Sequence, residues 1–355
     1  MFNPFRMFFP KKMVGIDIGT SSIKIVEISR FGQGKTVENY GEIKSASFYK
    51  ELMDANQKGR SLLSNDFIAK TIRGVLDEAN IKTKSAIFSI PDFSTFCTSF
   101  EIPQMTEKEI PNAIYFNASQ YITLPISEVT LDWLVEPSLQ RDKSKPIKVF
   151  LVAVPNQVIQ SYKEIARLAG LKLYALEAEA LGVARALVKN NKKSICIIDI
   201  GAQSSTINIV ERGFLRKSYS FNFNSGQLLK SVAQVLEVDL AQAQDIINKE
   251  GLLFKRQDVT KALYLLIDPL LADIKNIVEE FLQAEKKPIE EIYLTGGTAN
   301  LPGLKEYFSE SLKKTVLAPN CFSDFLYPPI LEETLKDLSP SFSATIGVAL
   351  GGLDE

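Results

Sequence analysis

The sequence of 355 residues contains no histidine, one tryptophan and three cysteines. Without histidine, the chain cannot form a Ser-His-Asp triad, a histidine general base or an HExxH zinc site. Cys97, Cys196 and Cys321 are odd in number and far apart, so we expect neither a disulfide framework nor a CxxC metal site, and we expect a reducing compartment. These absences exclude much of the chemistry of hydrolases and metalloenzymes.

Neither sign of charge dominates the chain, because 41 basic residues face 42 acidic ones and leave a net charge of -1. No global positive field therefore attracts nucleic acid. No apolar run reaches the roughly 18 residues of a transmembrane helix, and the amino terminus lacks the apolar core of a secretory signal. The sequence predicts a folded cytoplasmic protein with no transmembrane segment and no nucleic-acid partner.

A strand-turn pattern occurs once in each half of the chain. Residues 14–29 and 195–210 both alternate around β-branched residues and both contain Asp-Ile-Gly, at residues 17–19 and 199–201, followed by small polar residues. Each segment predicts a β-hairpin whose turn follows the aspartate. Two halves with one design indicate an internal duplication.

Helices and strands alternate through the rest of the chain. Apolar spacing predicts helices over residues 65–80, 106–121, 156–169, 177–189, 225–236, 240–249, 258–284 and 342–350, and strands over residues 86–90, 129–135, 149–154 and 292–294. The charged segment 141–146 predicts a solvated loop. The alternation indicates an α/β protein.

Glycine-rich turns after strands are candidate phosphate sites, because their backbone N–H groups can surround phosphate oxygens and glycine adds no Cβ clash. One such turn alone is more simply a hairpin, but two facing turns, with a third at residues 296–297, would hold a triphosphate from both sides. Asp17 and Asp199 are positioned to hold a hydrated Mg²⁺, and Lys24 to meet a phosphate. The predicted nucleotide-binding residues are Asp17, Gly19, Thr20, Ser21, Ser22, Lys24, Asp199, Gly201, Ala202, Gln203, Ser204, Gly296, Gly297 and Thr298.

Five segments, in order, resemble the motifs of the actin-like ATPase superfamily, which includes actin, heat-shock chaperone ATPases, sugar kinases and the cell-division protein FtsA. Residues 14–24 and 198–205 resemble its two phosphate motifs, and residues 293–303 its adenosine motif. Residues 177–184 and 343–349 resemble its two connecting helices. The resemblance implies a duplicated, ribonuclease H-like fold of two lobes that binds ATP and Mg²⁺ in the cleft between them.

Within this superfamily the chain most resembles the PilM family of type IV pilus assembly proteins, essentially over residues 1–351. The resemblance is carried by residues 89–92, 116–125, 131–133, 152–155 and 167–171. It implies a cytoplasmic scaffold, peripheral to the inner membrane, that binds the cytoplasmic N-terminal tail of PilN, contacts other pilus inner-membrane and motor components and self-associates. The residues it suggests for an extended-peptide groove are Phe116, Tyr121, Leu131 and Trp133.

The same resemblance predicts how the chain divides. It gives an N-terminal tail (1–12), a first-lobe core (13–92 and 172–192), an inserted α+β subdomain (93–171), a second-lobe core (193–224 and 286–340), a helical subdomain (225–285) and a C-terminal helix that returns to the first lobe (341–355). The phenylalanines of the tail fit contact with a membrane surface, but Pro4 and Pro10 prevent a long helix and favour a flexible tail or docking segment.

Two positions depart from the superfamily pattern. Many relatives carry Ala-Glu-x-x-Lys, whose glutamate and lysine approach the ribose and adenine, where this chain has Gln244 and Ile247. Gln244 can still bond a ribose hydroxyl, whereas Ile247 cannot replace a lysine, so nucleotide affinity and base choice stay open. The second departure, Ala178, is expected to change only packing.

Catalysis is a separate question. Glu179 occupies the connecting-helix position that orients water in some relatives, although a helix glutamate is more often a solvated or capping residue. Slow ATP hydrolysis and ATP binding without turnover both fit. The alternatives from other classes are a sugar-kinase-like phosphotransferase, for which we find no convincing base and sugar-binding set, and an FtsA-like filament-forming, membrane-associated protein.

Overall fold

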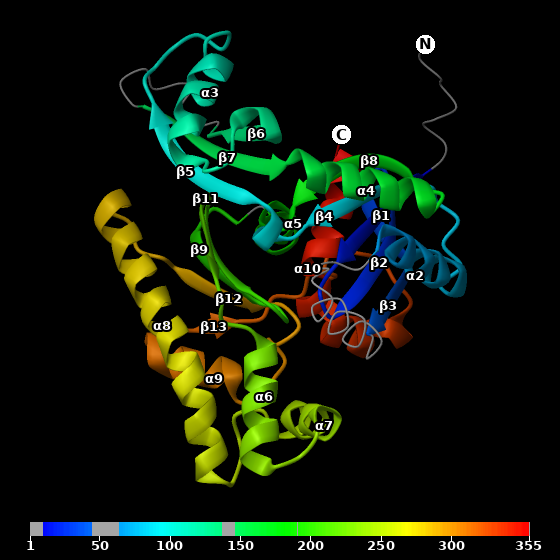
Figure 1. The fold of residues 1–355 in the computed structure, drawn as a ribbon, viewed down its shortest axis with the longest axis vertical. Coiled ribbons are helices and arrows are strands. Elements are labelled where there is room, and N and C mark those ends of the chain that lie inside the picture. The colour runs from blue at the N-terminus through cyan, green and yellow to red at the C-terminus, as the bar shows by residue number, and fades with distance from the viewer. Residues whose placement is uncertain (1–9, 45–63, 137–145, 190, 355) are drawn as a thin grey trace.

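The structure is a computed structural model that describes residues 10–136, except for residues 45–63, and residues 146–354, except for residue 190. It has two lobes built on one plan (Figure 1). The expected contacts of tail residues 1–9 and the predicted loop at residues 141–145 lie outside the described residues. Residues 11 and 12 are not part of a tail, because they begin the first strand.

The first lobe contains a five-stranded mixed sheet in the order β3-β2-β1-β4-β8. Its strands are β1 (Lys11–Ile18), β2 (Ser22–Phe31), β3 (Gly34–Lys44), β4 (Ser85–Ile90) and β8 (Lys172–Ala178). The first three strands form antiparallel pairs, whereas β4 runs parallel to both β1 and β8. Helices α2 (Asn65–Glu78) and α4 (Asn156–Leu168) cover one face of this sheet and share a core with it.

The second lobe repeats this sheet in the order β11-β10-β9-β12-β13. Its strands are β9 (Ser194–Ile200), β10 (Ser205–Glu211), β11 (Phe214–Phe221), β12 (Glu291–Thr295) and β13 (Val316–Leu317). Its helices are α6 (Ser225–Leu236), α7 (Leu240–Glu250), α8 (Gln257–Glu285) and α9 (Leu304–Leu312). Two hairpins followed by parallel strands in the same order confirm the internal duplication.

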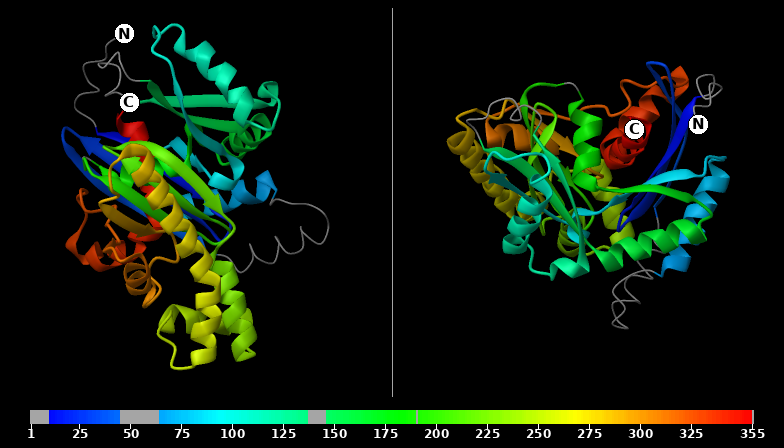
Figure 2. Two further views of the ribbon diagram at one scale, coloured as in Figure 1. Left: turned by 90° about the vertical axis from the view of Figure 1, so that its left-hand side faces the viewer. Right: turned by 90° about the horizontal axis from the view of Figure 1, so that it is seen from above.

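Two helices, α5 (Glu179–Val188) and α10 (Glu332–Asp354), lie between the sheets of the two lobes (Figures 1 and 2). They touch at Gly182 and Gly347, where a Cβ on Gly347 would overlap the Gly182 carbonyl. Glycine is therefore required for this close approach. The structure corrects two predicted boundaries: α10 begins ten residues before residue 342, and residues 177 and 178 end β8 rather than begin α5.

The inserted subdomain is a three-stranded antiparallel sheet in the order β5-β7-β6, covered on one face by α3 (Ile110–Tyr121). Its strands are β5 (Phe96–Ile102), β6 (Val129–Val135) and β7 (Ile147–Pro155). Phe150 and Val152 of β7 belong instead to the central core cluster, which also contains residues of α5, α10 and β11. The predicted boundary at residue 171 differs from the structure, because α4 packs with α2 in the first-lobe core. No helix among the described residues is both long enough and apolar enough to cross a membrane.

Candidate functional site

The two repeated turns have the same backbone geometry. In the first turn the Gly19 N–H donates to the Ser22 carbonyl at 3.0 Å, and in the second the Gly201 N–H donates to the Ser204 carbonyl at 3.0 Å. Each turn follows a strand that contains an aspartate near its end, and the chain then returns in an antiparallel strand. The predicted hairpins are therefore present at the predicted positions, with the ends of β1 and β9 as their supports.

Asp17 in the first turn is buried and has two partners. The Ser89 hydroxyl donates to its Oδ1 at 2.5 Å, and the Lys24 Nζ lies 3.6 Å from its Oδ2. Strand pairing explains both contacts, because Asp17 lies opposite Lys24 on β2 and opposite Ser89 on β4. The lysine side chain is 13% exposed, so its charge is largely shielded from water near the turn.

Asp92 is a site residue that the sequence analysis did not select. It lies in a short 3₁₀ turn (Asp92–Ser94) after β4, and its side chain is buried. Thr206 of the second lobe and the backbone of Ala180 on α5 lie near enough to lower its pKa against the effect of burial, while its Oδ1 has no partner among the described residues. Its position directly after a predicted strand and Pro91 is the signal that could have identified it.

Four carboxyl groups share this region with one lysine. Burial raises the pKa of Asp92 to about 6, and burial together with the nearby Asp92 raises that of Asp199 to about 7. Burial and the charges of Asp17, Asp92 and Asp199 raise the pKa of Glu179 well above its ordinary value. Lys24 opposes the shifts of Asp199 and Glu179 but does not cancel them. The cluster therefore has an excess of acidic groups that a bound cation would stabilise.

The carboxyl groups suit a hydrated Mg²⁺ better than a tightly caged metal. No three of the acidic or cysteine side chains in the described part of the chain converge closely enough to hold a metal ion. Mg²⁺ commonly uses one or two protein carboxylates and completes its coordination with water and substrate phosphate oxygens. The unpartnered Oδ1 of Asp92 is a further acceptor in the same region. The residues present therefore fit this ion together with a polyphosphate.

The third predicted turn lies against the second one. Gly296 has a φ of +89°, and a Cβ at this position would overlap the Asp199 carboxylate. The Thr298 N–H donates to the Ile200 carbonyl at 3.4 Å. The structure thus brings Gly296 and Thr298 to the end of β9, while Gly297 is exposed beside them.

Helix α6 supports the second turn from the other side. Its N-cap residue Asn224 donates through Nδ2 to the Gln203 carbonyl at 3.0 Å, and the Ser225 N–H donates to the Gly201 carbonyl at 3.0 Å. On the next helix, α7, Gln244 is exposed and donates to Asn248 at 2.9 Å, whereas Ile247 is buried in the lobe core. No contact recorded for the described residues joins Gln244 to the turns, so its ribose role stays a prediction.

The four residues predicted for the peptide groove do not form one exposed surface. Phe116 on α3 is 71% exposed, and the exposed Tyr121 stacks on Phe100 with ring centroids 5.5 Å apart. Trp133 is half-buried and meets the Tyr115 ring edge-on. Leu131 lies in the core between the insertion sheet and α3, so its contact with a peptide stays a prediction.

Comparison with known proteins agrees with this architecture. The family model described as "Type IV pilus assembly protein PilM" matches residues 15–353. The cell division protein FtsA of Staphylococcus epidermidis is 19% identical over 345 residues, covering 85% of this chain and 73% of FtsA.

Two solved structures show the same fold. A PilM-PilN type IV pilus biogenesis complex aligns with a TM-score of 0.82 and 21% identity, covering 97% of this chain and 99% of that one. MreB5 of Spiroplasma citri bound to ADP aligns with a TM-score of 0.51 and 13% identity, covering 92% and 97% of the two chains. The predicted actin-like, two-lobed α/β fold is confirmed.

Proposed function

Because the chain belongs to the PilM family of type IV pilus assembly proteins, we propose that it is a cytoplasmic assembly scaffold that binds Mg²⁺ and ATP between its lobes and the N-terminal tail of PilN. The observation that carries the nucleotide proposal is the pair of turns with one backbone geometry, beside four carboxyl groups and a single lysine. Family membership and the structural likeness to a PilM-PilN complex support the partner. The chain thus attaches to the inner membrane through its partners.

Each part of the site has a distinct role in this proposal. The backbone N–H groups of residues 20–22 and 202–204 bind phosphate oxygens, whereas those of Gly19 and Gly201 close the turns, and Lys24 adds a positive charge. Asp17 and Asp199 hold the hydrated ion, which supplies positive charge to the phosphates. Residues 296–298 form the wall on the adenosine side. The unpartnered Oδ1 of Asp92 would accept a hydrogen bond from a water bound to the ion.

Glu179 is proposed as the residue that orients water at the γ-phosphate. Burial and the neighbouring carboxyl groups raise its pKa and so favour the neutral form of the carboxyl group, which is a poor base. We therefore expect at most slow hydrolysis. Glu179→Gln should lower single-turnover hydrolysis at least about ten-fold and leave Mg·ATP affinity within about three-fold. Equal hydrolysis by both proteins would remove Glu179 from this role.

The first test is calorimetric titration of the purified protein with Mg·ATP, with and without a synthetic PilN-tail peptide. Asp17→Ala and Asp199→Ala should each weaken ATP binding about 100-fold or more and leave peptide affinity unchanged, because the ion loses a ligand. Asp77→Ala is the matched control, since Asp77 lies exposed on α2. Peptide binding without any ATP binding would mean a scaffold that does not use nucleotide, as Ile247 in place of lysine would allow.

The described residues provide no separate support for the two alternatives, a sugar-kinase-like enzyme and an FtsA-like filament protein. A sugar-kinase-like enzyme needs a carboxylate base beside sugar-binding groups, whereas the carboxyl groups whose pKa is raised, Asp92, Glu179 and Asp199, lie around the predicted phosphate and metal site. The FtsA likeness covers 85% of this chain at 19% identity, whereas the PilM family model matches residues 15–353. The PilM assignment therefore accounts for more of the chain.

A further inference from the structure

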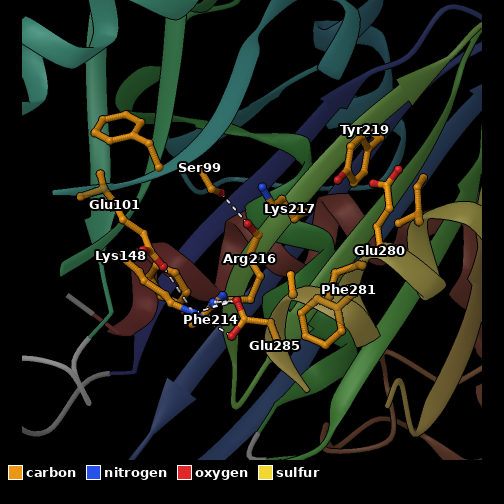
Figure 3. Close-up of a pocket in the computed structure, with 15 residues that line it drawn as sticks. Ser99, Glu101, Lys148, Phe214, Arg216, Lys217, Tyr219, Glu280, Phe281 and Glu285 are labelled. Carbon is orange, nitrogen blue, oxygen red and sulfur yellow. Dashed lines mark hydrogen bonds and ion pairs between the residues drawn. The ribbon is translucent and has the colours of Figure 1, made fainter. Parts of the chain in front are cut away.

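A buried ion-pair network joins the inserted subdomain to the second lobe, well away from the three turns. At its centre is Arg216 on β11, whose side chain is 7% exposed. Its Nη1 donates to Glu136 of the insertion at 2.8 Å. Its Nη2 donates to Glu285 at the end of α8 at 2.6 Å (Figure 3). Glu211 lies 3.4 Å from the same guanidinium group. A single arginine thus holds carboxylates from both bodies.

Two further bonds cross the same boundary. Lys148 of β7 donates to both carboxylate oxygens of Glu285 at 2.7 Å, and the Ser99 hydroxyl of β5 donates to the Arg216 carbonyl at 2.5 Å (Figure 3). We call Ser99, Glu136, Lys148, Arg216 and Glu285 the Arg216 latch. Three of these residues belong to the insertion and two to the second lobe, so the latch ties together segments that are far apart in the chain.

The boundary beside the latch is not fully packed. A cavity of about 200 Å³ lies between the insertion and the second lobe, with Phe100 and Val149 on one side and Phe214, Tyr219 and Phe281 on the other. A continuous core would fill such a space. Besides the apolar core that Phe150 and Val152 share with Leu215, the two bodies are held by directional polar bonds. These bonds can be made or broken as a unit, beside a space into which side chains can move.

Both second-lobe residues of the latch lie on elements that reach the candidate nucleotide site. Arg216 is near the start of β11, and the last residue of that strand, Phe221, pairs with Ser205 directly after the second turn. Glu285 ends α8, which packs against α6, the helix whose N-cap contacts the second turn. A rearrangement at the second turn can therefore be transmitted to the latch through one rigid strand pair and one helix pair.

We propose that the Arg216 latch makes the insertion move with the second lobe rather than with the first lobe, into whose chain it is inserted. Closure of the lobes on nucleotide then displaces the insertion relative to the first lobe and changes the affinity for a peptide bound between them. This inference rests on the proposed binding of nucleotide and peptide. By linkage, the peptide changes nucleotide affinity by the same factor.

Two variants test the latch in the full chain. Arg216→Gln removes the central cation, and Lys148→Gln, at a side chain 20% exposed, is the milder change if Arg216→Gln fails to fold. The matched control is Arg167→Gln, which removes a bidentate pair with Glu164 on the exposed surface of α4. The measurements are hydrogen exchange of β5 and β7, and calorimetry of a PilN-tail peptide with and without Mg·ATP.

In the wild type we expect Mg·ATP to change peptide affinity at least about five-fold. Either latch variant should reduce this factor to below about two and speed exchange in β5 and β7 at least about ten-fold, because the boundary opens more often. The control should change neither. A wild type that binds both ligands without coupling, or latch variants that keep full coupling, would overturn the proposal. Absence of ATP binding in the wild type would refute the proposed function. The latch would then be tested by hydrogen exchange alone, and unchanged exchange of β5 and β7 in the latch variants would refute it.

Discussion

The two turns proposed to bind phosphate have the same backbone geometry but differ in the side chains around them. In the first turn, Asp17 has a lysine and a serine as partners. In the second, Asp199 lies opposite Thr206, a neutral residue that lies near Asp92. The second turn is held by backbone contacts with the third turn and α6. The first turn thus carries the positive charge, and the second turn has the backbone support.

The strongest test of this difference is Gly296→Ala. A Cβ at Gly296 would overlap the Asp199 carboxylate, and the φ of +89° adds strain, so we expect the free energy of unfolding to fall by about 3 kcal/mol. Gly297→Ala is the control, because a Cβ there meets nothing within 4 Å. Urea denaturation of the two variants measures the difference. Equal losses would mean that the third turn does not support the second.

The second prediction concerns the pH dependence of stability. The pKa of Asp199 is raised to about 7 in the folded protein by burial and by Asp92, above about 3.9 in the unfolded chain. The folded state therefore binds this proton more tightly, and the free energy of unfolding falls as pH rises through this interval. We expect the free energy of unfolding of the ligand-free wild type to fall by on the order of 2 kcal/mol between about pH 4.5 and 7.5. Asp199→Asn should not show this fall.

Urea denaturation at several pH values without Mg²⁺ or nucleotide measures this slope. Asp77→Asn is the control, because it removes one exposed carboxyl group outside the cleft. If the stability of Asp199→Asn falls with rising pH as steeply as that of the wild type, then Asp199 is not the source of the slope. The two turns would then not differ in the electrostatic way described above.

The features that the sequence predicts well are those encoded by local repetition. Asp-Ile-Gly occurs twice, and equal local sequence gives two turns closed by the same hydrogen bond. Apolar periodicity likewise places α2, α6, α7 and α8 within a few residues, because each buries one continuous face. Neighbouring strands then bring Asp17 to Lys24 through simple pairing.

The features that it misses depend on which segments meet in space. Asp92 becomes a site residue only because Thr206, from the other lobe, and α5 meet it. The periodicity of α4 predicts a helix but not that its apolar face packs on α2. Strand alternation places Leu131 and Trp133 on one face of β6. The sequence does not show that α3 covers this face.

The third prediction concerns the charge of the first turn. Lys24→Gln should weaken Mg·ATP binding about ten-fold, because Lys24 is the cation that accompanies the four carboxyl groups. Thr206→Val, at the equivalent position of the second turn, should weaken binding by less than about three-fold, since a neutral hydroxyl provides no charge for phosphate. Calorimetry of both variants compares the turns directly. Equal losses would mean that the second turn contributes as much as the first.

The smallest expected effect is that of Ser89→Ala. Its hydroxyl donates to the buried Oδ1 of Asp17, so its loss should lower the free energy of unfolding by about 1 kcal/mol and leave Mg·ATP affinity within about three-fold. Ser119→Ala, on the exposed surface of α3, should leave both unchanged. Thermal denaturation and calorimetry give the two quantities. If Ser89→Ala weakens ATP binding as much as Lys24→Gln, then serine, aspartate and lysine act as one network, and the first turn depends on β4 as much as the second depends on Gly296.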